Sequence, residues 1–298
     1  MKKKQWLGFV FLFTFTLYVE AKSVHIAVAA NFSKTMQSLV TEFEKTSEYQ
    51  IALSYGSSGK FYAQIKQGAP YELFFSADQA KPDALQKDGL VIASSRFTYA
   101  VGRLALWSAN PDFIDKIQVR LKDGSFNKLA MANPKLAPYG AATLQVLRYL
   151  ELIDVTQPKW VRGENIAQTY QFVSSGNADL GFIALSQLLD VSLGVSLGVS
   201  LGVSNVQQVN RGSYWLVPDN MHQPIKQDVV LLRSAVKSLG AKAFLDFIRT
   251  DKAQNIIAQY GYLTLNSLSD MNSLSDLNSL SDMNSLSDLN SLNAGQEP

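Results

Sequence analysis

The stretch that decides the fold is Val24-His-Ile-Ala-Val-Ala-Ala-Asn-Phe-Ser-Lys-Thr-Met-Gln-Ser-Leu-Val40. Apolar residues alternate with smaller ones from Val24 to Val28, which predicts a half-buried strand. From Phe32 the apolar residues recur at helical spacing, which predicts an amphipathic helix. Asn31 stands at the change of period, where a helix-capping residue belongs. Since a helix start leaves backbone N–H groups unpaired at the positive end of the helix dipole, it accepts an anion without any Lys or Arg.

The same arrangement recurs in the next segment. The run Gln50-Ile-Ala-Leu-Ser-Tyr55 predicts a second strand, and Gly56-Ser57-Ser58-Gly59 leads from it into a helix that carries Phe61 and Ile65. Two strand-to-helix turns built from small polar residues indicate two helix starts that face one ligand.

The N-terminus indicates export from the cytoplasm. Lys2, Lys3 and Lys4 precede an apolar run, and Val19-Glu20-Ala21 offers small residues for cleavage near Ala21. These features predict a secretory signal peptide over residues 1–21 and a soluble protein in the periplasm. The sequence contains no cysteine, which excludes a lipid anchor and a disulfide framework.

The charge balance excludes one class of partner. Removal of residues 1–21 takes away three Lys and one Glu, which brings the formal net charge from +2 to 0. We therefore expect no binding to nucleic acid, because that requires a basic surface. Any selectivity for anions must come from local dipoles.

Strand and helix patterns alternate through the rest of the chain. This alternation predicts an α/β fold with largely parallel sheets, divided into two lobes. We assign residues 22–100 to the first part of lobe one, 101–232 to lobe two, and 233–265 to C-terminal helices that return to lobe one.

Two repeats fall outside that pattern. Val191-Ser-Leu-Gly recurs up to Ser204, so residues 191–204 form a low-complexity insertion in lobe two. The tail 266–298 repeats Asn-Ser-Leu-Ser-Asp with an apolar residue at every third position, which gives neither a helical nor a strand face. We expect disorder or weak local helix there. A structural or adhesive role for the repeats is an alternative that their deletion tests.

Several separated motifs together resemble a known family. The motifs occur in the same order as in that family, between about Val24 and Leu265. The family is that of the periplasmic molybdate-binding proteins of ABC importers. The motifs are Val28-Ala-Ala-Asn-Phe, Tyr55-Gly-Ser-Ser-Gly, Gly68-Ala-Pro-Tyr-Glu-Leu-Phe-Phe-Ser-Ala-Asp78 and Ile256-Ile-Ala-Gln-Tyr-Gly-Tyr262.

The resemblance implies a two-lobed fold of the type II periplasmic binding proteins. Each lobe has a central sheet flanked by helices, and two hinge crossings join the lobes, which close on a tetrahedral oxyanion. It also implies a monomer without a cofactor that captures molybdate or tungstate and delivers it to a membrane permease. The sequence does not separate molybdate from tungstate.

The resemblance also implies the ligand-binding residues, which are neutral donors rather than cation ligands. A family position that is often Tyr falls on Ala184, which loses a hydroxyl, and Tyr139 is expected to supply the replacement. Lys60, beside the second turn, is expected to be a solvated surface lysine. The implied residues are Ala30, Asn31, Ser57, Ser58, Tyr139 and Ile166, with Ala184 as a further position.

Two alternatives remain open at this stage. A binding protein for another oxyanion such as sulfate would share the fold and the neutral donors, and cavity size separates the two. An exported enzyme is disfavoured, because the sequence holds only two histidines and shows no readable grouping of nucleophile, His and acid. His25 lies inside the first predicted strand, and His222 lies in a loop.

Overall fold

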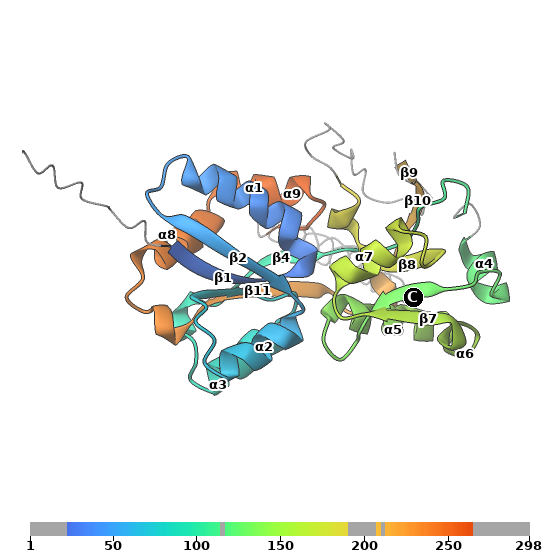
Figure 1. The fold of residues 1–298 in the computed structure, drawn as a ribbon, viewed down its shortest axis with the longest axis horizontal. Coiled ribbons are helices and arrows are strands. Elements are labelled where there is room, and N and C mark those ends of the chain that lie inside the picture. The colour runs from blue at the N-terminus through green and yellow to red at the C-terminus, as the bar shows by residue number, and fades with distance from the viewer. Residues whose placement is uncertain (1–22, 114–116, 190–206, 210–211, 265–298) are drawn as a thin grey trace, which may run out of the picture.

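A computed structural model describes residues 23–113, 117–189, 207–209 and 212–264. The expected signal peptide, the insertion 191–204 and the tail 266–298 lie outside the described residues. The described chain forms two lobes side by side (Figure 1).

The first lobe is built on a five-stranded sheet in the order β2-β1-β3-β11-β4. One face packs against α1, α8 and α9, and the other packs against α2 and α3. The strands are β1 Ser23–Ala29, β2 Gln50–Gly56, β3 Leu73–Phe75, β4 Phe97–Gly102 and β11 Ile225–Leu231. The helices are α1 Ser33–Glu44, α2 Ser58–Lys66, α3 Ala80–Lys87, α8 Leu239–Ile248 and α9 Asp251–Gln259.

The second lobe is built on a six-stranded sheet in the order β7-β6-β8-β5-β10-β9. Its strands are β5 Leu104–Ser108, β6 Leu129–Ala132, β7 Trp160–Gly163, β8 Leu180–Ala184, β9 Gln207–Val209 and β10 Gly212–Leu216. Its helices are α4 Ile117–Asp123, α5 Pro138–Tyr149, α6 Ile153–Thr156 and α7 Ile166–Ser174. This architecture confirms the α/β two-lobed fold predicted from the sequence.

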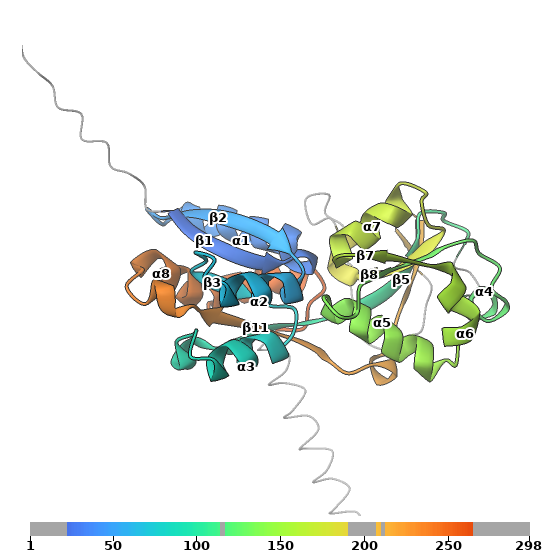
Figure 2. The same cartoon turned by 60° about the horizontal axis from the view of Figure 1, so that its bottom comes forward.

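The two chain crossings lie at positions that differ in part from the expected boundaries. The chain leaves the first sheet at Gly102 and enters the second at Leu104, close to the expected boundary at 101. It leaves the second sheet at Leu216 and re-enters the first at Ile225 (Figure 2), although residues up to 232 were assigned to lobe two. That boundary is wrong, because β11 pairs with β3 and β4 in the first sheet. The apolar pattern of a strand does not say which sheet it joins.

The direction of the strands also differs from the expectation. Strand β1 runs parallel to β2 and β3, and β6 runs parallel to β7 and β8. The strands next to the crossings, β4, β5, β10 and β11, instead pair antiparallel with their neighbours. Both sheets are therefore mixed rather than largely parallel. The physical reason is that these strands connect the lobes directly, without the crossover helix that parallel pairing requires.

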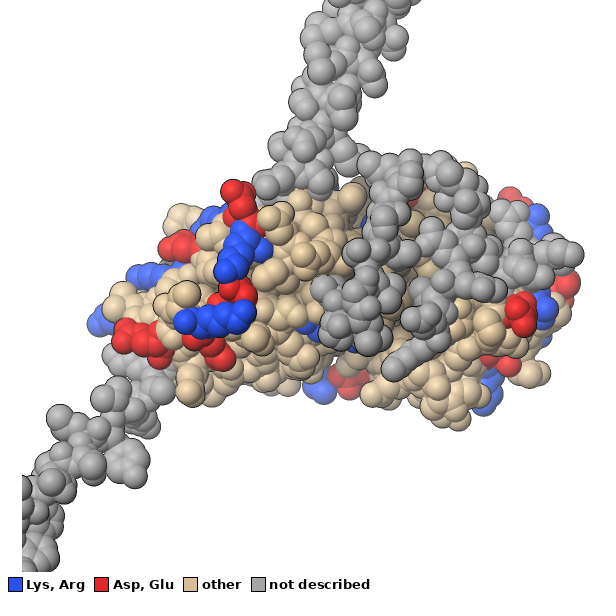
Figure 3. Space-filling model, turned by 90° about the horizontal axis from the view of Figure 1, so that it is seen from above, with Lys and Arg blue, Asp and Glu red and all other residues tan. Residues whose placement is uncertain are grey.

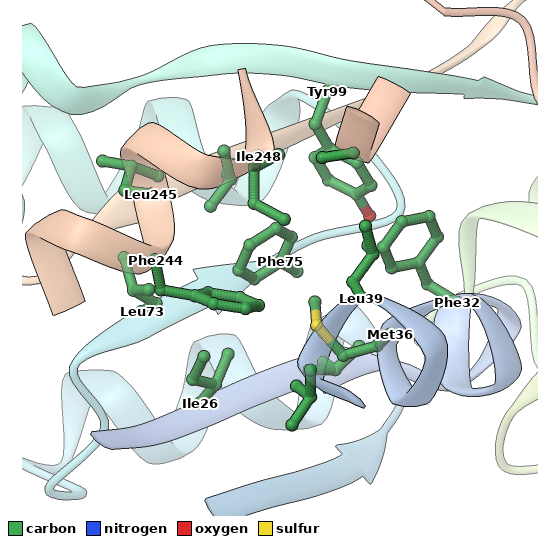
Figure 4. Close-up of a cluster of buried hydrophobic side chains, with 14 of the residues drawn as sticks. Ile26, Phe32, Met36, Leu39, Leu73, Phe75, Tyr99, Phe244, Leu245 and Ile248 are labelled. Atoms are coloured by element: carbon green, nitrogen blue, oxygen red, sulfur yellow. The ribbon is translucent and has the colours of Figure 1, made fainter. Parts of the chain in front are cut away.

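The core of the first lobe holds the start of α1 in place. Phe32, which follows Asn31, has no exposed surface and packs edge-on against Tyr99, with the ring centroids 4.8 Å apart. Figure 4 shows Phe32 beside Tyr99 in this core. Phe32 also packs edge-on against Tyr262, with the ring centroids 5.2 Å apart. Full burial of such a side chain stabilises the fold by about 1.5–3 kcal/mol. The turn at Asn31 is therefore anchored by the core directly behind it.

Candidate anion-binding site

Four helix starts meet at one cavity between the lobes. The first lobe contributes the 3-10 turn η1 (Ala30–Phe32), which leads into α1, and the start of α2. The second lobe contributes the starts of α5 and α7. Because each start carries unpaired backbone N–H groups and a partial positive charge, the four together favour an anion in the space between them.

The cavity is small and its lining is neutral. The volume open to the centre of a water-sized sphere is about 10 Å³, so the space suits a compact ion rather than a sugar or a peptide. None of its lining residues, all of which belong to the described ranges, carries a charged side chain. The lining residues are Ala29, Ala30, Asn31, Gly56, Ser57, Ser58, Ala77, Ala137, Pro138, Tyr139, Asn165 and Ile166.

This lining contains six of the seven residues that were expected to bind the ligand: Ala30, Asn31, Ser57, Ser58, Tyr139 and Ile166. Ala184 is not among them. It ends β8, and its N–H donates to Gln187 Oε1 at 3.0 Å. Asn165 was not predicted as a residue of the site, although an Asn just before a predicted helix is itself a capping signal.

Local chemistry explains why the helices begin at the cavity. Ser57 caps α2, where its side chain accepts from the N–H of Lys60 at 3.4 Å. Asn165 caps α7 and accepts from the N–H of Gln168 at 3.0 Å. Pro138 opens α5 at the first helical position, where its missing N–H costs nothing. The caps leave the first N–H groups of Ser58 and Ile166 without an intrahelical acceptor.

Ser58 is prepared to donate its hydroxyl proton. Its side chain is 1% exposed, and its Oγ accepts from the N–H of Ala77 at 2.9 Å. Because that bond uses a lone pair, the proton remains for another acceptor. Next to it, the Gly59 N–H donates across the lobes to the Leu136 carbonyl at 2.9 Å. A Cβ atom on Gly59 would lie 3.0 Å from that oxygen, so a larger residue would force the Leu136 backbone to move by a few tenths of an ångström.

Asn31 lies at the cavity, but its side chain does not act as expected. No side-chain cap bond precedes α1, because Asn31 sits inside η1. Its Nδ2 group donates to Gln227 Oε1 at 2.9 Å and to Tyr262 Oη at 3.1 Å. Its carbonyl accepts from Ser186 Oγ at 2.9 Å, and Tyr262 Oη lies 2.9 Å both from this carbonyl and from Ser186 Oγ, so its one proton serves either acceptor. The structure therefore leaves the backbone N–H of Asn31, rather than its amide, to face a ligand.

A buried polar network stands behind the lining. Tyr139 is 1% exposed, and its Oη accepts from Gln227 Nε2 at 3.4 Å. Burial raises the pKa of Tyr139 well above its ordinary value and that of Tyr262 to about 12, so both hydroxyls keep their protons at neutral pH. Ser186, in the turn η4 (Leu185–Gln187), joins the network from the second lobe. Of these residues, Tyr139 alone was expected at the site; Gln227, Tyr262 and Ser186 were not predicted.

Lys60 is an exposed surface lysine, as expected, and it also makes a contact between the lobes. Its Nζ lies 3.1 Å from Oε1 of Glu164, in the second lobe, and 3.4 Å from Oε2. Both side chains are about half exposed. Together with the bonds from Gly59 and Ser186, this pair holds the lobes against each other around the cavity.

Among the described residues, no helix has the length and apolar character needed to cross a membrane. The same residues contain no cluster of three or more His, Asp or Glu side chains suited to a metal ion.

Two lobes joined by two crossings, with a small cavity of converging helix starts between them, define a solute-binding protein. Residues 24–263 match the family of bacterial extracellular solute-binding proteins, and the chain belongs to that family.

Two curated relatives are the molybdate-binding proteins ModA of Azotobacter vinelandii and Rhodobacter capsulatus. The first is 44% identical over 243 residues, which cover 82% of this chain and 90% of the relative. The second is 40% identical over 244 residues, which cover 82% and 89%. The solved structure of the Azotobacter vinelandii periplasmic molybdate-binding protein superposes with a TM-score of 0.73 at 36% identity, covering 80% of this chain and 98% of that one.

Proposed function

We propose that this protein captures molybdate, and also tungstate, in the periplasm and delivers it to the membrane permease of an ABC importer. The observation that carries the proposal is the neutral cavity formed by helix starts from both lobes. The identity to two molybdate-binding relatives supports molybdate as the oxyanion.

The physical chemistry of the ligand agrees with this site. Molybdate is a tetrahedral dianion whose four oxygens accept hydrogen bonds and carry no proton at neutral pH. Backbone N–H groups of Asn31, Ser58 and Ile166 and the Ser58 hydroxyl supply donors from opposite sides of the cavity. Charge-assisted bonds of this kind are about twice as strong as neutral ones. We propose Ala30, Ser57 and Tyr139 as further contacts.

The remaining assignments belong to the same proposal. The protein acts as a monomer without a cofactor, performs no catalysis, and loses residues 1–21 on export. On the face drawn in Figure 3, acidic and basic side chains of the first lobe lie next to one another. Among the ion pairs of this lobe, Glu42 contacts both Lys45 and Lys252. This mixed surface supports the absence of a nucleic-acid partner.

Calorimetric titration of the chain from residue 22 onward tests the proposal. Molybdate, tungstate, sulfate and phosphate are titrated separately at the same ionic strength. We expect tight binding of molybdate and tungstate, weak binding of sulfate, and compaction in small-angle scattering when the lobes close on molybdate. Sulfate that binds as tightly as molybdate would instead support the general oxyanion-binding alternative.

A further inference from the structure

Gln227 does not line the cavity, yet it contacts Asn31 and Tyr139, two residues that do. It lies on β11 near the return crossing and has no exposed surface. The register between β11 and β4 shifts between Gln227 and Asp228, which marks a β-bulge. Bulges commonly re-aim a side chain. A buried neutral amide placed at such an irregularity requires defined hydrogen-bond partners.

The partners of Gln227 fix the orientation of its amide. Oε1 accepts from Asn31 Nδ2 at 2.9 Å and from Tyr99 Oη at 3.0 Å. The Tyr99 hydroxyl also lies 3.1 Å from the Ser76 carbonyl, so its one proton is shared between two acceptors. The Asn31 amide is then the donor that sets the oxygen end of Gln227, and the NH₂ end lies 3.4 Å from Tyr139 Oη. The chain of hydrogen bonds thus runs in one direction, from Asn31 through Gln227 to Tyr139.

This direction determines what the Tyr139 hydroxyl offers to a ligand. A phenol has one proton, and in this structure Tyr139 directs it toward the Tyr262 hydroxyl. Because the Tyr139 oxygen already accepts from Gln227, that proton is what Tyr139 can offer to a stronger acceptor such as an oxyanion. Gly102 leaves the room for the pair, because a Cβ atom there would lie 2.1 Å from Tyr139 Oη and 2.6 Å from Gln227 Nε2. With an oxyanion in the cavity, the ligand oxygens are strong acceptors close to Tyr139.

We propose that Gln227 is a positioning residue that makes the Tyr139 hydroxyl a donor to the bound oxyanion. This inference rests on the proposed function. A site that presents only donors satisfies a fully deprotonated anion such as molybdate. An anion that keeps a proton at neutral pH, such as hydrogen phosphate, brings a donor that meets no acceptor, and an unpaired buried donor is costly. Gln227 therefore contributes to the rejection of protonated oxyanions.

The test measures affinities for molybdate and phosphate in variants of the whole mature chain. Gln227→Met keeps the length of the side chain but cannot donate, and Gln227→Glu replaces the NH₂ group with an acceptor. Gln254→Met is the matched control, because Gln254 is another buried amide of the first lobe, and its Nε2 donates to the Ile248 carbonyl at 2.8 Å, in a different part of the lobe. Thermal unfolding is recorded for each variant.

We expect Gln227→Met to weaken molybdate binding about tenfold, the usual effect of losing one hydrogen bond to a charged group. In a Tyr139→Phe background the same change should cost less than about twofold, because Gln227 acts through that hydroxyl. In Gln227→Glu the carboxylate accepts the Tyr139 proton and turns an oxygen lone pair toward the cavity. The preference for molybdate over phosphate should then fall about tenfold or more.

Two results would overturn the inference. One is an equal loss of affinity for both anions in Gln227→Glu, and the other is an additive loss in the Gln227→Met and Tyr139→Phe double variant. If Gln227→Met does not fold, the ratio of the molybdate and phosphate affinities in Gln227→Glu still tests the inference. If Gln227→Glu does not fold, the Gln227→Met and Tyr139→Phe double variant still tests it. Failure of the unmodified protein to bind molybdate would refute the proposed function instead, which keeps the two conclusions separate.

Discussion

Ser186 provides the sharpest test of closure between the lobes. This side chain belongs to the second lobe and is 4% exposed. Its Oγ donates to the Asn31 carbonyl and accepts from Tyr262 Oη, both at 2.9 Å, and both partners belong to the first lobe. These bonds therefore exist only while the lobes are together. We expect Ser186→Ala to destabilise the closed form and to leave each lobe intact.

The magnitude follows from the two bonds that are lost. A buried hydrogen bond between neutral groups contributes about 1 kcal/mol, and Tyr262 still reaches the Asn31 carbonyl at 2.9 Å in the variant. A net loss of about 1.4 kcal/mol corresponds to tenfold weaker binding of molybdate. Because closure follows the first encounter with the anion, most of the change should appear as faster dissociation.

Calorimetry and stopped-flow dissociation with molybdate provide the measurement, and Ser38→Ala provides the control. Ser38 Oγ also contacts a tyrosine hydroxyl, that of Tyr260 at 2.8 Å, but both residues belong to the first lobe. The control should lower the melting temperature and leave the affinity within about twofold. An unchanged dissociation rate in Ser186→Ala, or an equal loss of affinity in the control, would refute the reasoning.

Three further predictions follow from the site and the sequence. Asn31→Asp places a carboxylate beside the dianion and against Gln227 Oε1, so the affinity for molybdate should fall by about two orders of magnitude or more. Ser58→Ala removes one hydroxyl donor and should weaken binding about ten- to a hundredfold. A larger loss in Ser58→Ala than in Asn31→Asp in titrations would contradict this. Removal of the half-exposed Lys60–Glu164 pair by Lys60→Gln should weaken binding by less than about fivefold, and the difference should vanish in high salt. A chain ended after Leu265 should keep its affinity and melting temperature, because residues 266–298 repeat without a consistent apolar face; a large fall in either would assign the tail a role.

The starts of the helices were predictable because their signals are local. The Ser57-Ser58 turn shows a cap and a change of hydrophobic period within a few residues, and Ile166 directly follows a capping Asn. Both lie at the cavity, as expected. The two-lobed fold was predictable for a related reason, since alternating strand and helix patterns extend along most of the chain.

The roles of the polar side chains were not predictable, because their partners are distant in sequence. Asn31 bonds to Gln227 and Tyr262, which are 196 and 231 residues away, so a reading of the local pattern assigned its amide to a helix cap or to the ligand. The assignment of β11 to the wrong lobe has the same origin. Its apolar sequence is compatible with either sheet, and pairing with β3 and β4 decides between them.

The pairing of β4 with β11 also determines how the lobes move. Gly102, where the chain leaves the first sheet, lies opposite Ile225, where it returns, so the two linking segments begin as neighbouring strands of one antiparallel ribbon. Because both links leave the first sheet side by side, we expect them to bend together when the lobes separate and close. A shared bend would return α5 and α7 to their places opposite η1 and α2, which rebuilds the cavity.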